Sequence, residues 1–125
     1  MPSEFEVLSD AELMAVPATR SAATDAPAVV LELVVEAIPG REQELLNFLA
    51  LAFPFYESQG GHMILLRDEA EPRVFRELGF YASEEEWAQV DRLAREDPRT
   101  GEVLRRWRAL LSGPPRMRVL RRVRL

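Results

Sequence analysis

His62 is the chain's only histidine, and it is the first candidate for chemistry near neutral pH. A histidine titrates close to neutrality, so His62 could act as a single catalytic general base. One histidine without any cysteine cannot build a multi-histidine or thiolate metal centre, and we expect no metal, haem or other cofactor. The alternative is a structural role for His62 at the start of a strand, near solvent or a subunit interface.

Aromatic side chains form a second candidate set. They could line a pocket between a sheet and its helices, where a flat ligand would stack against them. The alternative is that they fill the core at helical spacing. The predicted substrate-pocket residues are Tyr56, Phe80, Trp87 and Trp107, with Tyr81 as a further member of the set.

Two carboxylates, Glu32 and Glu36, lie at the same parity of an alternating strand pattern, so both should point to one face of a sheet. Such a pair could perform acid–base work or hold a divalent cation. The alternative is ion pairing, because the last segment of the chain carries arginines at alternate positions. We predict that Glu32 and Glu36 pair with Arg118 and Arg122, across the sheet or across a dimer interface.

Charge is unevenly distributed along the 125 residues, whose net charge is −5. Residues 1–98 hold 7 arginines against 20 acids, whereas residues 99–125 hold 9 arginines against one acid. A basic tail could bind nucleic acid or an acidic membrane, but an otherwise acidic chain would repel phosphates, so internal pairing is favoured. All 16 basic residues are arginine, which excludes a Schiff-base lysine and a phosphate-loop lysine.

The length fits one domain with a modest core. No apolar run approaches the roughly 18 residues of a membrane span, so we expect no membrane segment. The N-terminus is acidic and lacks the pattern of a secretory signal. The sequence therefore predicts a cytoplasmic protein.

Hydrophobic periodicity predicts the order strand, helix, two strands, helix, strand. This order is typical of an α+β, ferredoxin-like βαββαβ domain, a four-stranded antiparallel sheet with helices on one face. The predicted domain covers residues 28–125. Its expected segments are strands at 28–38, 62–67, 73–82 and 116–125, and helices at 41–57, from 84, and at 102–111 after a break at Asp97-Pro98.

Residues 1–27 differ in composition and form a predicted N-terminal arm, partly ordered, with a short helix at residues 10–15 capped by Ser9. Its large apolar residues include Phe5, Leu13 and Met14. We expect the arm to be dispensable for the fold and to contribute to assembly by folding across a partner subunit.

Three stretches resemble the dimeric α+β barrel superfamily, and within it the antibiotic-biosynthesis-monooxygenase-like domains. They are Ile-Pro-Gly-Arg-Glu-Gln-Glu at 38–44, Gly-Gly-His at 60–62, and Phe-Tyr-Ala-Ser-Glu-Glu-Glu-Trp at 80–87. The resemblance covers about residues 28–125. It implies a homodimer in which two sheets face each other. It also implies either a cofactor-independent oxygenase or one of the family's other roles.

The sequence departs from the family at several positions. Many members place a histidine three residues after the helical aromatic, where this chain has Val90, and a second histidine where it has Arg99. Haem-degrading members use an asparagine on the first strand, which is absent here, and a helical tryptophan, which Trp87 matches. Haem degradation is therefore disfavoured.

Two functions remain open at this point. The first is a small-molecule-binding, monooxygenase-like enzyme without a cofactor, acting on a planar or aromatic substrate, with Trp87 and Tyr56 as its wall and His62 as its base. The second is a non-catalytic dimeric ligand-binding or stress-related protein with a filled core. They differ in whether a cavity with a titratable wall lies between sheet and helices.

Overall fold

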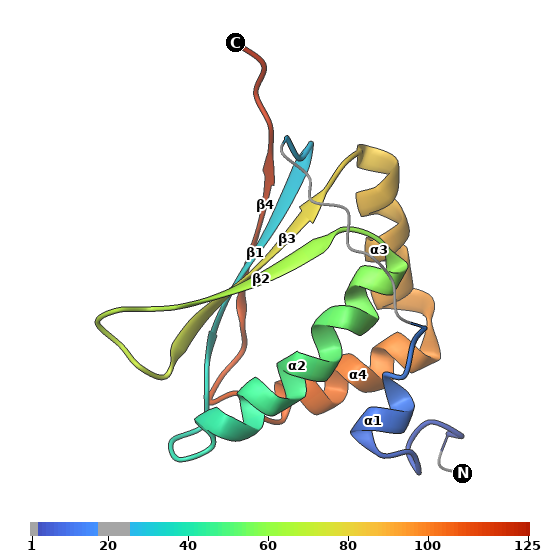
Figure 1. The fold of residues 1–125 in the computed structure, drawn as a ribbon, viewed down its shortest axis with the longest axis vertical. Helices are drawn as coiled ribbons and strands as arrows, with labels where there is room; N and C mark the ends of the chain where they lie inside the picture. The colour runs from blue at the N-terminus through green and yellow to red at the C-terminus, as the bar shows by residue number, and fades with distance from the viewer. Residues whose placement is uncertain (1–2, 18–25) are drawn as a thin grey trace.

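The computed structural model describes residues 3–17 and 26–125 and has the ferredoxin-like α+β fold. One antiparallel sheet lies on one side and the helices on the other (Figure 1). The elements are α1 (Asp10–Leu13), β1 (Val29–Glu36), α2 (Glu42–Gln59), β2 (His62–Arg67), β3 (Val74–Tyr81), α3 (Glu84–Glu96), α4 (Pro98–Arg108) and β4 (Arg116–Arg121).

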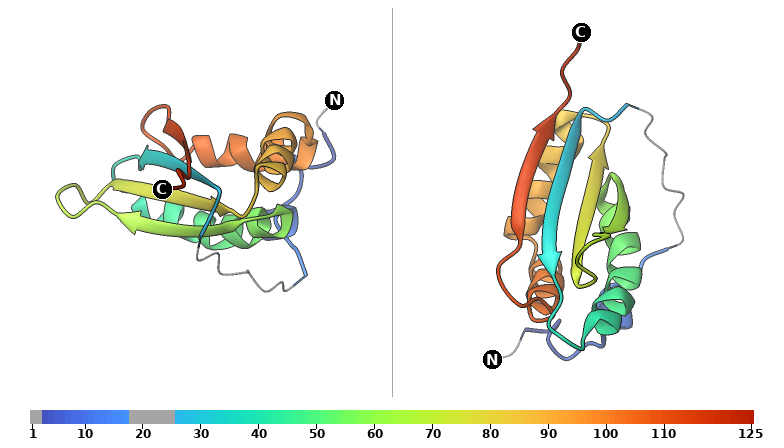
Figure 2. Two further views of the ribbon diagram at one scale, coloured as in Figure 1. Left: turned by 90° about the horizontal axis from the view of Figure 1, so that it is seen from above. Right: turned by 90° about the vertical axis from the view of Figure 1, so that its left-hand side faces the viewer.

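The four strands are ordered β2-β3-β1-β4, so the first and last strands of the domain are hydrogen-bonded neighbours. In the register, Leu31 of β1 lies opposite Gly79 of β3, and Glu32 lies opposite Arg118 of β4. Side chains alternate between the two faces of a strand. The helices cover one face, which we call the inner face, and none of the described helices lies on the other, the outer face (Figure 2).

The strand β4 is shorter than the predicted 116–125. It ends at Arg121, which lies opposite Val29, the first residue of β1. One further backbone bond, from the amide of Arg122 to the carbonyl of Ala28, spans 3.0 Å. Beyond it the described residues form no further strand for pairing, and the last residues project past the sheet and are exposed (Figure 1).

The core fills the space between the inner face and α2 and α4. α2 contributes a stripe at the spacing of an amphipathic helix, and α4 contributes Val103 and Trp107. The break between α3 and α4 occurs where predicted, because Asp97 caps α4 by accepting a bond from the amide of Thr100 and Pro98 occupies its first turn. The buried residues of α2 are Leu45, Phe48, Leu49, Ala52 and Phe55.

The described part of the arm packs on its own chain. Leu13 and Met14 are fully buried within the core cluster. The guanidinium of Arg99 donates to the carbonyls of Leu13 and Ala15 at 2.6 and 2.7 Å, and Arg106 pairs with Asp10 at 2.9 Å. These contacts tie the described part of the arm to α4, and the expectation that the arm is dispensable for the fold stays a prediction.

No helix among residues 3–17 and 26–125 is long and apolar enough to cross a membrane.

Candidate functional site

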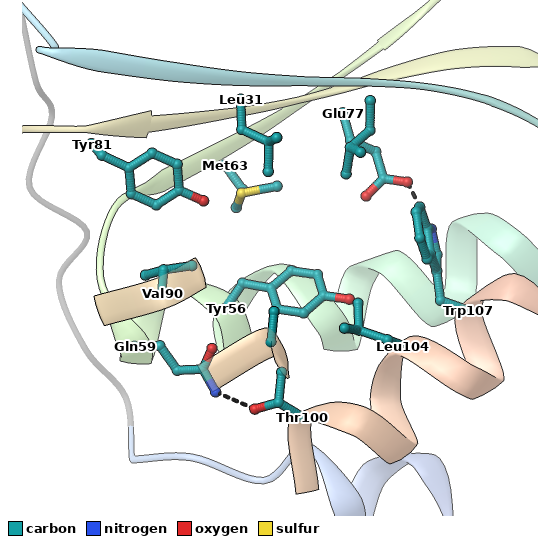
Figure 3. Close-up of a pocket in the computed structure, with 12 residues that line it drawn as sticks. Leu31, Tyr56, Gln59, Met63, Glu77, Tyr81, Val90, Thr100, Leu104 and Trp107 are labelled. Carbon is teal, nitrogen blue, oxygen red and sulfur yellow. Dashed lines mark hydrogen bonds between the residues drawn. The ribbon is translucent and has the colours of Figure 1, made fainter. Parts of the chain in front are cut away.

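A cavity of about 90 Å³ lies between the inner face of the sheet and the three long helices (Figure 3). Its lining is mostly apolar, from Leu31, Leu33, Met63, Val90, Ala94 and Leu104. Its polar groups come from β3 and from α2 and α4, and they are Glu77, Tyr81, Tyr56, Gln59, Thr100 and the indole of Trp107.

Glu77 is the charged group of this lining. It stands on β3 between Phe75 and Gly79 on the inner face, and only 1% of its surface is exposed. The indole Nε1 of Trp107 donates to its Oε2 at 2.8 Å. Burial raises the pKa of Glu77 to about 7, although the indole bond opposes that rise. A carboxyl in this state can take up or release a proton near neutral pH.

Two tyrosines, Tyr56 of α2 and Tyr81 of β3, complete the polar wall (Figure 3). Burial raises the pKa of Tyr81 to about 12. Burial also raises the pKa of Tyr56, and the nearby Glu77 and Tyr81 raise it further. Both phenols therefore keep their protons at neutral pH and can donate hydrogen bonds into the cavity.

One end of the cavity is closed by a chain of hydrogen bonds between helices. The side-chain amide of Gln59 donates to the Thr100 hydroxyl at 2.7 Å, and that hydroxyl donates to Asp97 at 2.8 Å. These bonds join the last residue of α2 to the first turn of α4. By contrast, none of the residues of α3, all of which the structure describes, is fully buried.

The four aromatic residues predicted for the pocket fall in different places. Tyr56 and Trp107 line the cavity. Trp87 does not line it but packs against the ring of Tyr81, with centroids 5.3 Å apart. Phe80 points to the outer face, because its neighbours Gly79 and Tyr81 point inward.

His62 also lies away from the cavity. It is the register partner of Phe80, and the two rings stack with centroids 6.5 Å apart. Its Nδ1 lies 2.8 Å from the Oε2 atom of Glu57, which also accepts a bond from the amide of Met63 at 2.9 Å. The next residue, Met63, lines the cavity, so His62 itself faces outward. The structure thus places Glu77, and not the predicted His62, at the cavity wall.

Glu77 could have been recognised from the sequence pattern. The inner positions of β3 are Phe75, Glu77, Gly79 and Tyr81, so a carboxylate occupies a position in an otherwise uncharged row of that strand. An ionised carboxylate buried at such a position costs free energy unless it is paired or hydrogen-bonded, so it is a candidate for a functional role. Sequence reasoning missed it because acidic residues are common in this chain.

The predicted charge pairs are found in part on the outer face. Glu32 lies 2.9 Å from Arg118 of β4 and 3.2 Å from Arg76 of β3. Glu36 lies 3.2 Å from Arg73, just before β3, and not next to an arginine of β4. Arg122 lies beyond the end of β4 and is exposed. The pairing therefore links three neighbouring strands through Glu32.

Metal ligands do not gather in the described residues, where no group of three or more histidine or acidic side chains could hold an ion. The arrangement of the cavity supports acid–base chemistry instead. It combines a partly enclosed apolar space, one carboxyl whose pKa is raised to about 7 and two phenolic donors.

The fold is that of the antibiotic biosynthesis monooxygenase-like proteins. A structure from Bordetella bronchiseptica assigned to these monooxygenases aligns with a TM-score of 0.62 at 18% identity, covering 77% of this chain and 98% of that one. A second, from Nitrosomonas europaea, aligns with a TM-score of 0.62 at 9% identity, covering 81% and 96%. A NIPSNAP family protein from Agrobacterium tumefaciens aligns with a TM-score of 0.59 at 22% identity, covering 74% and 90%.

No protein-family model matches the sequence, and no curated protein is significantly similar to it. The predicted resemblance is therefore confirmed for the fold, through structures of low sequence identity.

Proposed function

We propose that this domain binds a small planar molecule and acts on it as a monooxygenase-like enzyme without a cofactor, with Glu77 as the general base. The observation that carries the proposal is the position of the Glu77 carboxyl, buried at the wall of an apolar cavity with a pKa of about 7. Enclosed carboxyls with raised pKa values are typical of acid–base sites. His62 is replaced as candidate base because it faces away from this cavity.

The size of the cavity limits the substrate. An engineered apolar cavity of about 150 Å³ admits benzene, whereas this one measures about 90 Å³. A single-ring substrate therefore requires a small outward shift of one wall. α3 is the element best able to move, since its residues Val90 and Ala94 line the cavity and none of its residues is fully buried.

In the proposed reaction, Glu77 takes a proton from an activated C–H bond, whose electron pair remains on the substrate as a carbanion. The carbanion reduces molecular oxygen and the carbon is oxygenated, so that a CH₂ group and O₂ give a carbonyl group and water. The protein supplies the base and excludes bulk water from the carbanion. No redox-active group of the protein is needed for this balance.

We also propose that the chain forms a homodimer through the outer face of the sheet. That face combines the ion pairs of Glu32 with aliphatic side chains such as Ile64, Leu66 and Leu120, of which the last two are 47% and 45% exposed. A second copy of the chain would cover these exposed aliphatic side chains, and contiguous exposed apolar surface of this kind marks interaction sites.

The dimer is tested by light scattering. The wild-type chain should have twice the 14.2 kDa of a single chain. Leu120→Glu should dissociate it, whereas Val123→Glu, beyond the end of β4 and 76% exposed, should not. A wild-type monomer at micromolar concentration contradicts the proposal.

The alternative is a non-catalytic ligand-binding protein, and turnover separates the two. We would measure oxygen consumption by the full chain with monocyclic hydroquinones and small 1,3-diketones, and binding by the shift in melting temperature. With a substrate, Glu77→Gln should lower kcat by about 100-fold or more, the typical contribution of a general base.

The matched control is His62→Gln, which changes the candidate suggested by sequence and should leave kcat within about threefold of the wild type if that side chain stays outside the chemistry. If His62→Gln abolishes turnover and Glu77→Gln does not, the assignment of the base is wrong. Binding without oxygen consumption supports the non-catalytic alternative. If the chain shows no binding and no turnover, its core is filled.

A further inference from the structure

The inner face of β3 carries a carboxylate, a glycine and a tyrosine at successive inward positions, Glu77, Gly79 and Tyr81. The middle residue, Gly79, has no side chain, and the side chain of Tyr81 extends over it. A Cβ atom added at Gly79 would lie 2.7 Å from the Tyr81 hydroxyl oxygen, a separation that real Cβ atoms essentially never show. The hydroxyl therefore occupies the space that a side chain between Tyr81 and Glu77 would fill.

A second glycine supports the same ring from the turn just before β2. Gly61 has a φ of +84°, and an added Cβ there would lie 2.6 Å from Cε1 of Tyr81. The ring of Trp87 packs on Tyr81 at 5.3 Å from the side of α3. Two glycines and one indole thus fix the tyrosine ring, and Figure 3 shows its hydroxyl directed into the cavity.

We propose that Tyr81 is a hydrogen-bond donor to an acceptor oxygen of the substrate, so that the cavity selects a small conjugated carbonyl compound or phenol-like ring. This inference rests on the proposed function, because it takes Glu77 as the base that removes the adjacent proton. The C–H bond breaks, its proton moves to the Glu77 carboxylate, and its electron pair moves into a C=C bond as the carbonyl oxygen becomes an enolate oxygen. Tyr81 donates to that oxygen, and its bond strengthens as the negative charge develops.

The geometry favours this role over simple packing. A buried phenol needs a partner for its hydroxyl, and here the hydroxyl faces a cavity, with no hydrogen bond to an acceptor among residues 3–17 and 26–125. A phenylalanine would fill the same apolar volume. Of the two glycines, Gly79 is the one whose added Cβ atom would meet the hydroxyl oxygen itself, at 2.7 Å, a contact that a phenylalanine would not make.

The test compares two ring-sized probes of nearly equal shape, 4-fluorophenol and 4-fluorotoluene, by ¹⁹F NMR titration of the full chain. The wild type should bind the phenol roughly tenfold more tightly, the ratio that one good hydrogen bond provides. Tyr81→Phe, which keeps the ring, should reduce the ratio to about threefold or less, and should leave 4-fluorotoluene binding unchanged.

Glycine variants test whether displacing the Tyr81 hydroxyl has the same effect on binding as removing it. Gly79→Ala should reduce the phenol preference as Tyr81→Phe does, because the new methyl group displaces the hydroxyl. Gly113→Ala is the matched control, since a Cβ atom there meets no atom within 4 Å, and its ratio should equal that of the wild type. Near-ultraviolet circular dichroism identifies any variant that fails to fold. If Gly79→Ala fails to fold, the role of Tyr81 is decided by the phenol preference of Tyr81→Phe alone.

The outcomes distinguish this inference from the function on which it rests. If both probes bind the wild type equally, or if Tyr81→Phe keeps the full preference, the role of Tyr81 is overturned while a ligand-binding cavity stands. If neither probe binds the wild type, the cavity admits no ring, and the proposed function fails together with this inference.

Discussion

The indole nitrogen of Trp107 and the carboxylate of Glu77 lie 2.8 Å apart, joined by a hydrogen bond inside the core. Trp107 comes from α4 and Glu77 from β3, and their side chains meet at one end of the cavity (Figure 3). The indole is a donor that cannot accept, so it favours the ionised carboxylate, whereas burial favours the neutral acid. Glu77 is balanced between these effects at a pKa of about 7.

The first prediction concerns the pH dependence of stability. Because the folded state raises the pKa of Glu77 from 4.5 to about 7, the folded protein holds this proton more tightly than the unfolded chain. Its contribution to stability is fully present below pH 4.5 and is lost as the pH rises through 7, by roughly 3 kcal/mol in total. Urea unfolding at pH 4.5 and pH 8 should show this loss for the wild type relative to Glu77→Gln, whose amide does not titrate. A constant difference between the two proteins would mean that Glu77 is not desolvated.

The second prediction concerns Trp107. In Trp107→Phe the carboxylate loses its donor, so the pKa of Glu77 should rise further above 7. The pH at which this stabilisation is lost, and the acidic limb of the kcat profile if Glu77 is the base, should both move to higher pH by about one unit, as expected for a lost bond to a charged group worth about 1.5 kcal/mol. A matched control is Trp87→Phe, which alters an indole outside the cavity lining and should leave the pH dependence of stability and of kcat unchanged.

The third prediction concerns the arm. Leu13 is fully buried, so Leu13→Ala should lower the free energy of unfolding by about 2–5 kcal/mol. Val7→Ala is the control, because Val7 is 76% exposed and its truncation should change stability by less than about 0.5 kcal/mol. A chain that starts at Ala28 should be less stable than the full chain. If its unfolding midpoint in urea is unchanged, the arm is dispensable, as the sequence suggested.

The fourth prediction concerns Glu32. Its bond with Arg118, followed by the charges of Arg118 and Arg76, lowers its pKa below 4.5. The stabilisation is therefore present above pH 4.5 and lost as the pH falls through the lowered value. In a single chain Glu32→Gln should cost about 1 kcal/mol or less, because Arg118 is 68% exposed and water screens the pair.

A dimer that covers the outer face should make this cost larger, because a lost partner then leaves a buried charge, which costs roughly 3 kcal/mol. Glu36→Gln is the comparison, since both Glu36 and Arg73 are well exposed. Equal effects of the two changes on dimer dissociation at pH 5 and pH 8 would show that Glu32 stays solvated.

The sequence by itself determined the order and nature of the elements. Strict alternation in 28–38 and 73–82, the Pro39-Gly40 turn and the capping serine before α3 are local signals, and each acts through neighbouring residues only. The charge match between the first and last strands also followed, because the βαββαβ order makes them neighbours, and Glu32 does meet Arg118. The antiparallel sheet and its single layer of helices are therefore present as predicted.

The tertiary structure decided the site. Alternation says which residues share a face but not which face the helices will cover, and this choice placed His62 and Phe80 outside and Glu77 and Tyr81 inside. It also brought Trp107 across to Glu77, thirty residues away in sequence, and so set the pKa of that carboxyl. A pKa depends on burial and on partners from distant segments, and these exist only once the chain is folded.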